Sequence, residues 1–146
     1  MIGRRAMLAG AGSGLLAAGI GGWAYTRDAF DGAALDPEAA HRAAVSGEVT
    51  LVDLRRPDEW EATGVPEGAV PLDMRRGDFL DALTQAVGGD RSAPVALICA
   101  GGVRSDRMAA RLAEAGFARV VDVPEGMLGS GSGPGWVARG LPVTRP

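Results

Sequence analysis

The middle of the chain reads Val95-Ala96-Leu97-Ile98-Cys99-Ala100-Gly101-Gly102-Val103-Arg104-Ser105. Its first four residues form a continuous apolar run, which is typical of a buried central strand. Two glycines follow, and the segment from Ser105 to Ala115 places Met108 and Leu112 on one face of a predicted helix. The pattern therefore predicts a strand, a short loop and a helix, with Cys99 at the point where the strand ends.

The segments on either side continue this alternation of strand and helix. Further strands are predicted over 49–54, 69–72 and 120–123, and further helices over 36–45, 60–62 and 79–87. Strands that alternate with helices usually form a parallel sheet, so we expect an α/β domain, a small parallel sheet flanked by helices on both faces. Ligands of such sheets bind at the carboxyl ends of the strands, where Cys99 lies.

Cys99 is the candidate nucleophile of this site. The glycines allow the loop to turn its backbone N–H groups inward, and the following helix directs its positive end at the same point. A thiolate is stabilised in such surroundings, and Arg104 adds a fixed charge for an anionic substrate. The alternative is a buried structural cysteine, which the two glycines, the arginine and the helix start together disfavour.

Composition excludes several other kinds of protein. The 146 residues contain one cysteine and one histidine, which excludes an internal disulfide framework, a cysteine-rich zinc site and a multi-histidine metal site. The 15 basic residues, all arginine, face 18 acids, so the net charge of −3 does not favour nucleic acid as a partner. The single histidine, His41, falls in the first predicted helix, and we interpret it as a surface residue.

The first 26 residues differ from the rest of the chain. Arg4 and Arg5 precede an uncharged run over 6–26, which would span about 30 Å as a helix, enough for a bilayer. This head resembles a twin-arginine export signal; a general secretory signal or a plain membrane anchor is the alternative. We expect export, either anchored at the periplasmic face of the inner membrane or soluble in the periplasm after cleavage. Residues 27–34 are predicted to be a linker, and 35–146 the folded domain.

Four motifs in the folded part resemble those of the rhodanese family of sulfurtransferases. They are the cysteine loop over 99–105, Val52–Arg55 with Glu59-Trp60 behind it, Gly64–Ala69, and Val123–Met127 followed by the tail from Trp136 to Val143. The resemblance covers about residues 35–143 in the right order. The sequence departs from the family pattern at Val65, where the family has histidine, and at Glu125, where it has glycine.

The resemblance implies a two-step sulfur transfer through Cys99 without metal or cofactor. The Cys99 thiolate takes the outer sulfur of a donor such as thiosulfate, and a thiol or cyanide then removes it from the persulfide. The substrate is bound by the loop residues Ala100, Gly101, Gly102, Val103 and Arg104. Four residues separate Cys99 from Arg104, whereas the related phosphatases have five, which disfavours phosphatase activity. A non-catalytic binding or sulfur-carrier module is the alternative function.

Three further residues are predicted to support the site. Asp53 either hydrogen-bonds the cysteine loop or caps a turn. Arg55 is expected to form an ion pair with Asp58 or Glu59 more readily than to bind a substrate anion. Ser105 is expected to cap the helix that follows the loop. The Gly/Ser-rich segment 129–135 follows the carboxyl end of a strand, and we hypothesise that it borders the site.

Overall fold

The computed structural model describes residues 24–25 and 32–146. Apart from the backbone of Ala24–Tyr25, the predicted signal or anchor segment lies outside the described residues. Residues 27–31 of the predicted linker also lie outside them. Among the helices of the described part, none is long and apolar enough to cross a membrane. The export and anchoring of the head therefore stay predictions.

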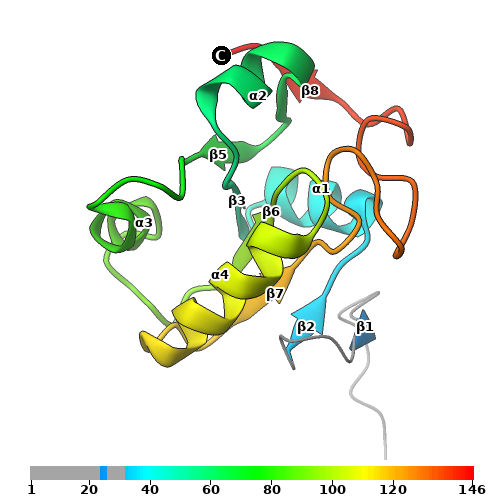
Figure 1. The fold of residues 1–146 in the computed structure, drawn as a ribbon. Helices are drawn as coiled ribbons and strands as arrows, with labels where there is room; N and C mark the ends of the chain where they lie inside the picture. Colours follow the sequence, from blue (N-terminus) through cyan, green and yellow to red (C-terminus); the bar gives the residue numbers. More distant parts are fainter. Residues whose placement is uncertain (1–23, 26–31) are drawn as a thin grey trace, which may run out of the picture.

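Six strands form one sheet in the order β1-β2-β7-β6-β3-β5 (Figure 1). Their bounds are Ala24–Tyr25 for β1, Ala33–Ala34 for β2, Thr50–Asp53 for β3, Ala69–Pro71 for β5, Val95–Ile98 for β6 and Val120–Asp122 for β7. The neighbouring strands β2, β7, β6, β3 and β5 pair in parallel, and β1 pairs antiparallel with β2. The predicted parallel sheet is confirmed.

Helices cover both faces of this sheet, as predicted. The helix α1 (Pro37–Ser46) lies on one face, and α3 (Phe79–Ala86) and α4 (Val103–Glu114) lie on the other (Figure 1). Residues of β6 alternate between the two layers, because successive side chains of a strand point to opposite faces. Val95 and Leu97 belong to the core under α4, whereas Ala96 and Ile98 belong to the core under α1.

Local signals in the sequence set the ends of α1. The Asp36 side chain accepts a hydrogen bond of 2.7 Å from the amide of Ala39, so it caps the first turn. The helix ends at Gly47, whose φ of 81° lies in the left-handed region that glycine adopts without strain. The short helix α2 (Pro57–Thr63) is longer than the single turn predicted over 60–62, because Pro57 starts it and Glu59 accepts the amide of Arg56.

Besides the antiparallel pairing of β1 with β2, two further pairings were absent from the sequence prediction. Ala33 and Ala34, predicted to be linker, form β2 and pair with Val121 and Asp122 of β7. A separate two-stranded antiparallel sheet joins β4 (Val65–Pro66) to β8 (Val143–Thr144). Strands of two residues carry no periodicity, so the sequence offered no signal for either pairing.

The parallel sheet brings the carboxyl ends of three strands together on one side. The strands β3, β6 and β7 are adjacent and point the same way, so their carboxyl ends lie side by side. Arg55 follows the first strand, Cys99 the second and Glu125 the third. All three residues are buried. Two predicted site residues, Arg55 and Cys99, therefore follow adjacent strand ends on the same side of the sheet, and Glu125 follows the third.

Candidate active site

The Cys99 sulfur lies inside the turn between β6 and α4. Its Sγ accepts hydrogen bonds from the Gly102 amide at 3.1 Å and from the Ser105 amide at 3.4 Å. The thiol also donates to Ser105 Oγ over 3.5 Å. The sulfur thus has three polar contacts, although Cys99 is buried and only 1% exposed. Two inward-facing amides are in place to stabilise negative charge at this atom.

The same contacts correct the role expected of Ser105. The residue that caps α4 is Gly102, which has no side chain to accept a hydrogen bond from the first turn. Ser105 lies within that turn, and its Oγ donates to the Gly102 carbonyl at 3.1 Å. The acceptor that a capping side chain usually supplies is the Cys99 sulfur. Ser105 is thus a neighbour of the Cys99 sulfur and not the helix cap.

Glycine is required at two points where the loop meets the segment after β7. Gly102 has a φ of 87°, and a Cβ there would collide with the carbonyl oxygen of Pro124. Gly126 has a φ of 67°, and its Cβ would collide with the carbonyl oxygen of Ala100. Both positions combine a left-handed backbone with a close backbone approach, so side chains would displace the loop. The departure at Glu125 leaves the second of these glycines in place.

The Gly/Ser-rich segment begins beside the cysteine loop, as hypothesised. The two residues before it, Met127 and Leu128, donate their amides to the carbonyl groups of Cys99 and Ala100, at 2.8 and 2.9 Å. The Gly129 carbonyl oxygen lies 3.7 Å from the position that a Cβ on Gly101 would occupy. The Ser130 hydroxyl donates to the Pro124 carbonyl at 2.7 Å and ties the segment back to the end of β7. The segment therefore borders the site, while its effect on donor binding stays a prediction.

Glu125 holds the far end of this segment through a hydrogen bond from the Gly135 amide. Its carboxylate accepts the Gly135 amide at 2.9 Å and a two-point hydrogen bond from Arg139, at 2.8 and 2.7 Å. Arg139 also reaches Glu38 of α1 at 2.8 Å. The Arg139 guanidinium lowers the pKa of Glu125, so this carboxylate stays charged. Sequence reasoning noted Glu125 only as a departure, because its partners lie far along the chain.

Arg55 has a different partner from the one predicted. Its guanidinium binds Asp53, with Nη2 at 2.8 Å from Oδ2, and it also donates to Thr63 and to the Gly64 carbonyl. Asp53 and Arg55 are 0% and 1% exposed. The predicted ion pair of Arg55 with the Asp58 or Glu59 side chain is wrong. Of these two residues, Glu59 alone contacts Arg55, and it does so through its backbone carbonyl. The buried pair fixes the chain that leaves β3 beside the cysteine loop.

Arg104 is held by Glu59. Its Nη1 and Nη2 donate to the two carboxylate oxygens at 2.8 and 2.6 Å, across 45 positions of sequence. These hydrogen bonds lower the pKa of Glu59 to about 2. The pKa of Arg104 is raised, mainly by Glu59 and to a smaller degree by the charges of Cys99 and Asp53. The predicted substrate-binding arginine thus lies near the nucleophile but already has a carboxylate partner.

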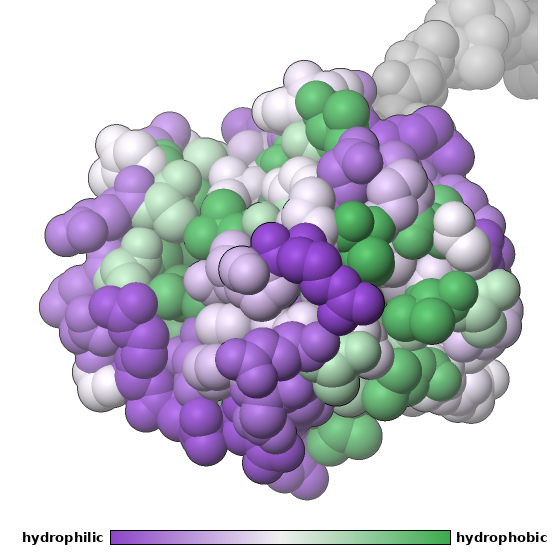
Figure 2. Space-filling view, turned by 90° about the horizontal axis from the view of Figure 1, so that it is seen from above, coloured by the Kyte–Doolittle hydropathy of each residue, from purple (hydrophilic) through white to green (hydrophobic). Residues whose placement is uncertain are grey.

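Apolar side chains stand next to the loop at the surface. Val103, the first residue of α4, is 59% exposed, and Leu128, which is hydrogen-bonded to Ala100, is 61% exposed. Figure 2 looks down on the molecule from the side of α2, and hydrophobic side chains lie among the charged ones on this face. The surroundings of the loop are therefore not uniformly charged.

His41 is not the plain surface residue that was expected. Its side chain is 20% exposed, and its ring stands edge-on to Trp136 with the centroids 5.5 Å apart. Its Nε2 lies 3.4 Å from a carboxylate oxygen of Glu67. Trp136 is fully buried in the core under α1. The histidine therefore belongs to the packing of that layer.

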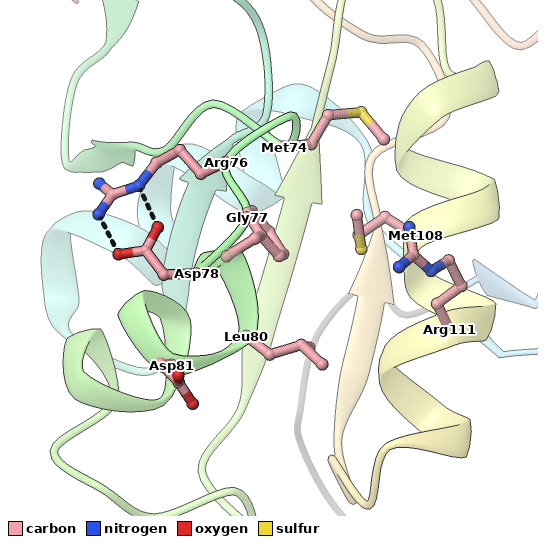
Figure 3. A pocket seen from close by; sticks show the side chains of 9 residues that line it. Met74, Arg76, Gly77, Asp78, Leu80, Asp81, Met108 and Arg111 are labelled. Atoms are coloured by element: carbon pink, nitrogen blue, oxygen red, sulfur yellow. Dashed lines mark hydrogen bonds and ion pairs between the residues drawn. The ribbon is translucent and has the colours of Figure 1, made fainter.

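A pocket of about 290 Å³ lies between the 74–81 segment and α4 (Figure 3). Met74, Leu80 and Met108 line it together with Arg111, and Arg76 is paired with Asp78 at its rim. Met108 follows Ser105 by three positions on α4, so the pocket begins about one turn from the cysteine loop. Within residues 32–146, no group of three or more His, Cys, Asp or Glu side chains could hold a metal ion.

The geometry defines a class of protein: an α/β domain with a strand-end cysteine inside a turn of inward-facing amides. Comparison with protein families identifies the group within this class. The profile of the rhodanese-like domain matches residues 36–129, and the chain belongs to that family. The expectation drawn from the four motifs is confirmed.

The chain is also similar to solved structures and to a curated relative. The polysulfide-sulfur transferase homodimer of Wolinella succinogenes superposes with a TM-score of 0.60 and 28% identity, covering 77% of this chain and 78% of that one. A thiosulfate sulfurtransferase of Pseudomonas aeruginosa shares the fold with a TM-score of 0.59 and 24% identity, covering 77% of this chain and 20% of that one. The tRNA uridine(34) hydroxylase of Nitrobacter hamburgensis is 31% identical over 95 residues, which are 64% of this chain and 37% of that relative.

Proposed function

We propose that the chain is a sulfurtransferase that carries a sulfane sulfur on Cys99. The observation that carries this proposal is the pair of amide hydrogen bonds from Gly102 and Ser105 to Sγ, because they stabilise a thiolate and then a persulfide anion. Membership of the rhodanese-like family supports it, as does the likeness to a structure named as a polysulfide-sulfur transferase.

The proposed reaction has two displacement steps. The Cys99 thiolate attacks the outer sulfur of a donor such as thiosulfate, the sulfur–sulfur bond breaks, and sulfite leaves with the electron pair. The product is a Cys99 persulfide, whose negative charge the two amides can stabilise. Cyanide or a thiol then attacks the outer sulfur of the persulfide, which returns the thiolate. Neither step needs a metal, an oxidant or a reductant.

The test uses the full chain in detergent, incubated with thiosulfate. Intact mass spectrometry should show the addition of one sulfur atom, and subsequent cyanide should remove it as thiocyanate. Cys99→Ser should abolish both signals, because an alkoxide does not form the persulfide. Absence of the added sulfur in the wild-type chain with every sulfane donor would refute the proposal.

The second candidate function is a binding or sulfur-carrier module, in which Cys99 is present but the chain does not catalyse repeated sulfur transfer. The observation that favours it is the 1% exposure of Cys99, which leaves little room for a donor in this conformation. Repeated turnover of thiosulfate and cyanide separates the two, because a passive carrier releases at most one thiocyanate per chain. The match covers only 37% of the Nitrobacter hydroxylase, so we do not carry its activity over to this chain. The net charge of −3 on this chain also does not favour a tRNA substrate.

We also propose that residues 6–26 carry the domain to the periplasmic side, either as an anchor or as a cleaved signal. The proposal is supported by the uncharged run behind Arg4 and Arg5. Fractionation of cells that express the full chain tests it. Recovery in the membrane or periplasm is expected, and recovery of the uncleaved chain from the cytoplasm alone would overturn it. Replacement of both arginines by glutamine should block export if the twin-arginine route is used.

A further inference from the structure

Both arginines beside the cysteine loop are already neutralised by carboxylates. Arg104 donates to both oxygens of Glu59, at 2.8 and 2.6 Å, and Arg55 is buried against Asp53 at 2.8 Å. A guanidinium that binds a carboxylate through two parallel hydrogen bonds has already used the pair of N–H donors that best matches an anion. An incoming anion would therefore have to compete with Glu59 for Arg104.

The Glu59 carboxylate is firmly held in its place. It also accepts the Arg56 amide at 3.0 Å at the start of α2, and its side chain is 19% exposed. The hydrogen bonds from Arg104 lower its pKa to about 2, so the carboxylate remains charged at any pH at which a thiolate forms. The ion pair thus persists under the conditions of sulfur transfer.

The charge of the donor then matters. Thiosulfate is a dianion, and a site in which Glu59 compensates the charge of Arg104 offers it little net attraction. A donor with one negative charge depends less on that attraction. Its organic group can also contact the exposed apolar side chains of Val103 and Leu128, which adjoin the loop. Charge and surface composition both favour an organic donor.

We propose that Glu59, by engaging Arg104, makes this site select sulfane donors with a single negative charge, organic thiosulfonates or persulfides, over thiosulfate. The inference rests on the proposed sulfurtransferase function and names its substrate class. With methanethiosulfonate, the Cys99 thiolate bonds to the outer sulfur, the sulfur–sulfur bond breaks, and methanesulfinate leaves with the electron pair. Glu59 acts through Arg104 and is a positioning residue, not a catalytic one.

Methanethiosulfonate and thiosulfate make a matched pair of probes, since a methyl group replaces one charged oxygen. For each donor, kcat/KM is measured by thiocyanate release from the full chain, with the uncatalysed rate subtracted. The wild type should prefer methanethiosulfonate. Glu59→Gln frees Arg104 from a charged partner, and we expect the thiosulfate-to-methanethiosulfonate ratio of kcat/KM to rise roughly tenfold, mainly through the KM for thiosulfate.

Two variants separate this effect from damage to the fold. Glu61→Gln makes the same change at an exposed residue of α2 and should leave the ratio as in the wild type. Glu59→Asp restores the charge and should bring back the preference for the monoanion. A structural defect alone would lower the rates with both donors and leave their ratio unmoved.

The outcomes also distinguish the two proposals. If neither donor adds sulfur to Cys99, the sulfurtransferase function itself fails. If both add sulfur but thiosulfate is used as well as methanethiosulfonate, or if Glu59→Gln leaves the ratio within about twofold of the wild type, the function stands and the selection by charge is overturned.

Discussion

The Cys99 sulfur lies 3.4 Å from the Ser105 amide nitrogen and accepts its hydrogen bond at the first turn of α4. The atom proposed to carry the chemistry is therefore also the acceptor that satisfies the helix start, with Gly102 as a second donor. The proposed catalysis and the local stability would depend on the same atom, and substitutions of Cys99 can separate the two roles.

Replacement of Cys99 by serine or alanine should abolish sulfur transfer equally but affect stability differently. Serine keeps an oxygen that can accept from Gly102 or Ser105, whereas alanine leaves two buried amides without an acceptor. We expect Cys99→Ala to be less stable than Cys99→Ser by about 1 kcal/mol. Urea unfolding of both variants measures the difference. Equal unfolding midpoints would contradict the capping role of the sulfur.

Gly102→Ala tests the close approach between the loop and Pro124. The alanine Cβ would both strain a φ of 87° and collide with the Pro124 carbonyl, so we expect loss of activity and a cost above about 2 kcal/mol. Gly116→Ala is the matched control: its φ is 90°, but nothing lies within 4 Å of the added carbon. The control should cost about 1 kcal/mol and retain activity. Similar losses in both variants would show that backbone strain alone, and not the contact, matters.

Local patterns predicted most of the fold, while contacts between distant residues escaped them. The apolar run over 95–98 and the capping residues of α1 identify elements because they act on their own neighbours in sequence. The pairing of β2 with β7 could not be predicted, since two alanines pair only because the β7 edge is available. The strand, loop and helix around Cys99 were predicted correctly, because these elements follow one another directly in the sequence.

The ion pairs of the site were missed for the same physical reason. Glu59 and Arg104 are 45 positions apart, and Glu38 and Arg139 are 101 positions apart. Charged side chains have many potential partners, and only the path of the chain selects one. Arg55 illustrates this point: the expected partners lay in the next turn, yet burial at the end of β3 favoured Asp53.

Arg55→Gln should destabilise the domain strongly. It leaves the Asp53 carboxylate buried without its cation, which costs about 3–5 kcal/mol in comparable pairs. The exposed pair of Arg76 and Asp78 provides the control, and Arg76→Gln should cost less than about 1 kcal/mol. Chemical unfolding monitored by tryptophan fluorescence compares the two. A small effect at Arg55 would show that water or a neighbouring group compensates Asp53.

Stability should fall in acid partly through Glu59. Its pKa is about 2 in the folded chain against an ordinary 4.5, so the carboxylate stabilises the fold above pH 4.5, and this contribution is lost as the pH falls toward 2. In Glu59→Gln the group does not titrate. The difference in unfolding free energy between wild type and variant should be constant above about pH 5 and shrink below pH 4.5. A difference independent of pH would place the stabilisation elsewhere.

The pairing of β2 with β7 indicates at which residue a stable fragment of the folded domain should begin. A fragment that begins at residue 32 keeps the pairing of Ala33 and Ala34 with β7, whereas one that begins at residue 35 keeps only the hydrogen bond from the Leu35 amide to the Asp122 carbonyl. The shorter fragment exposes the edge of β7, and an unpaired edge promotes association between chains. We therefore expect it to unfold at a lower temperature and to aggregate more readily. Thermal unfolding with light scattering, run on both fragments at equal concentration, checks this expectation, and identical curves would show that the two-residue strand contributes nothing to the sheet.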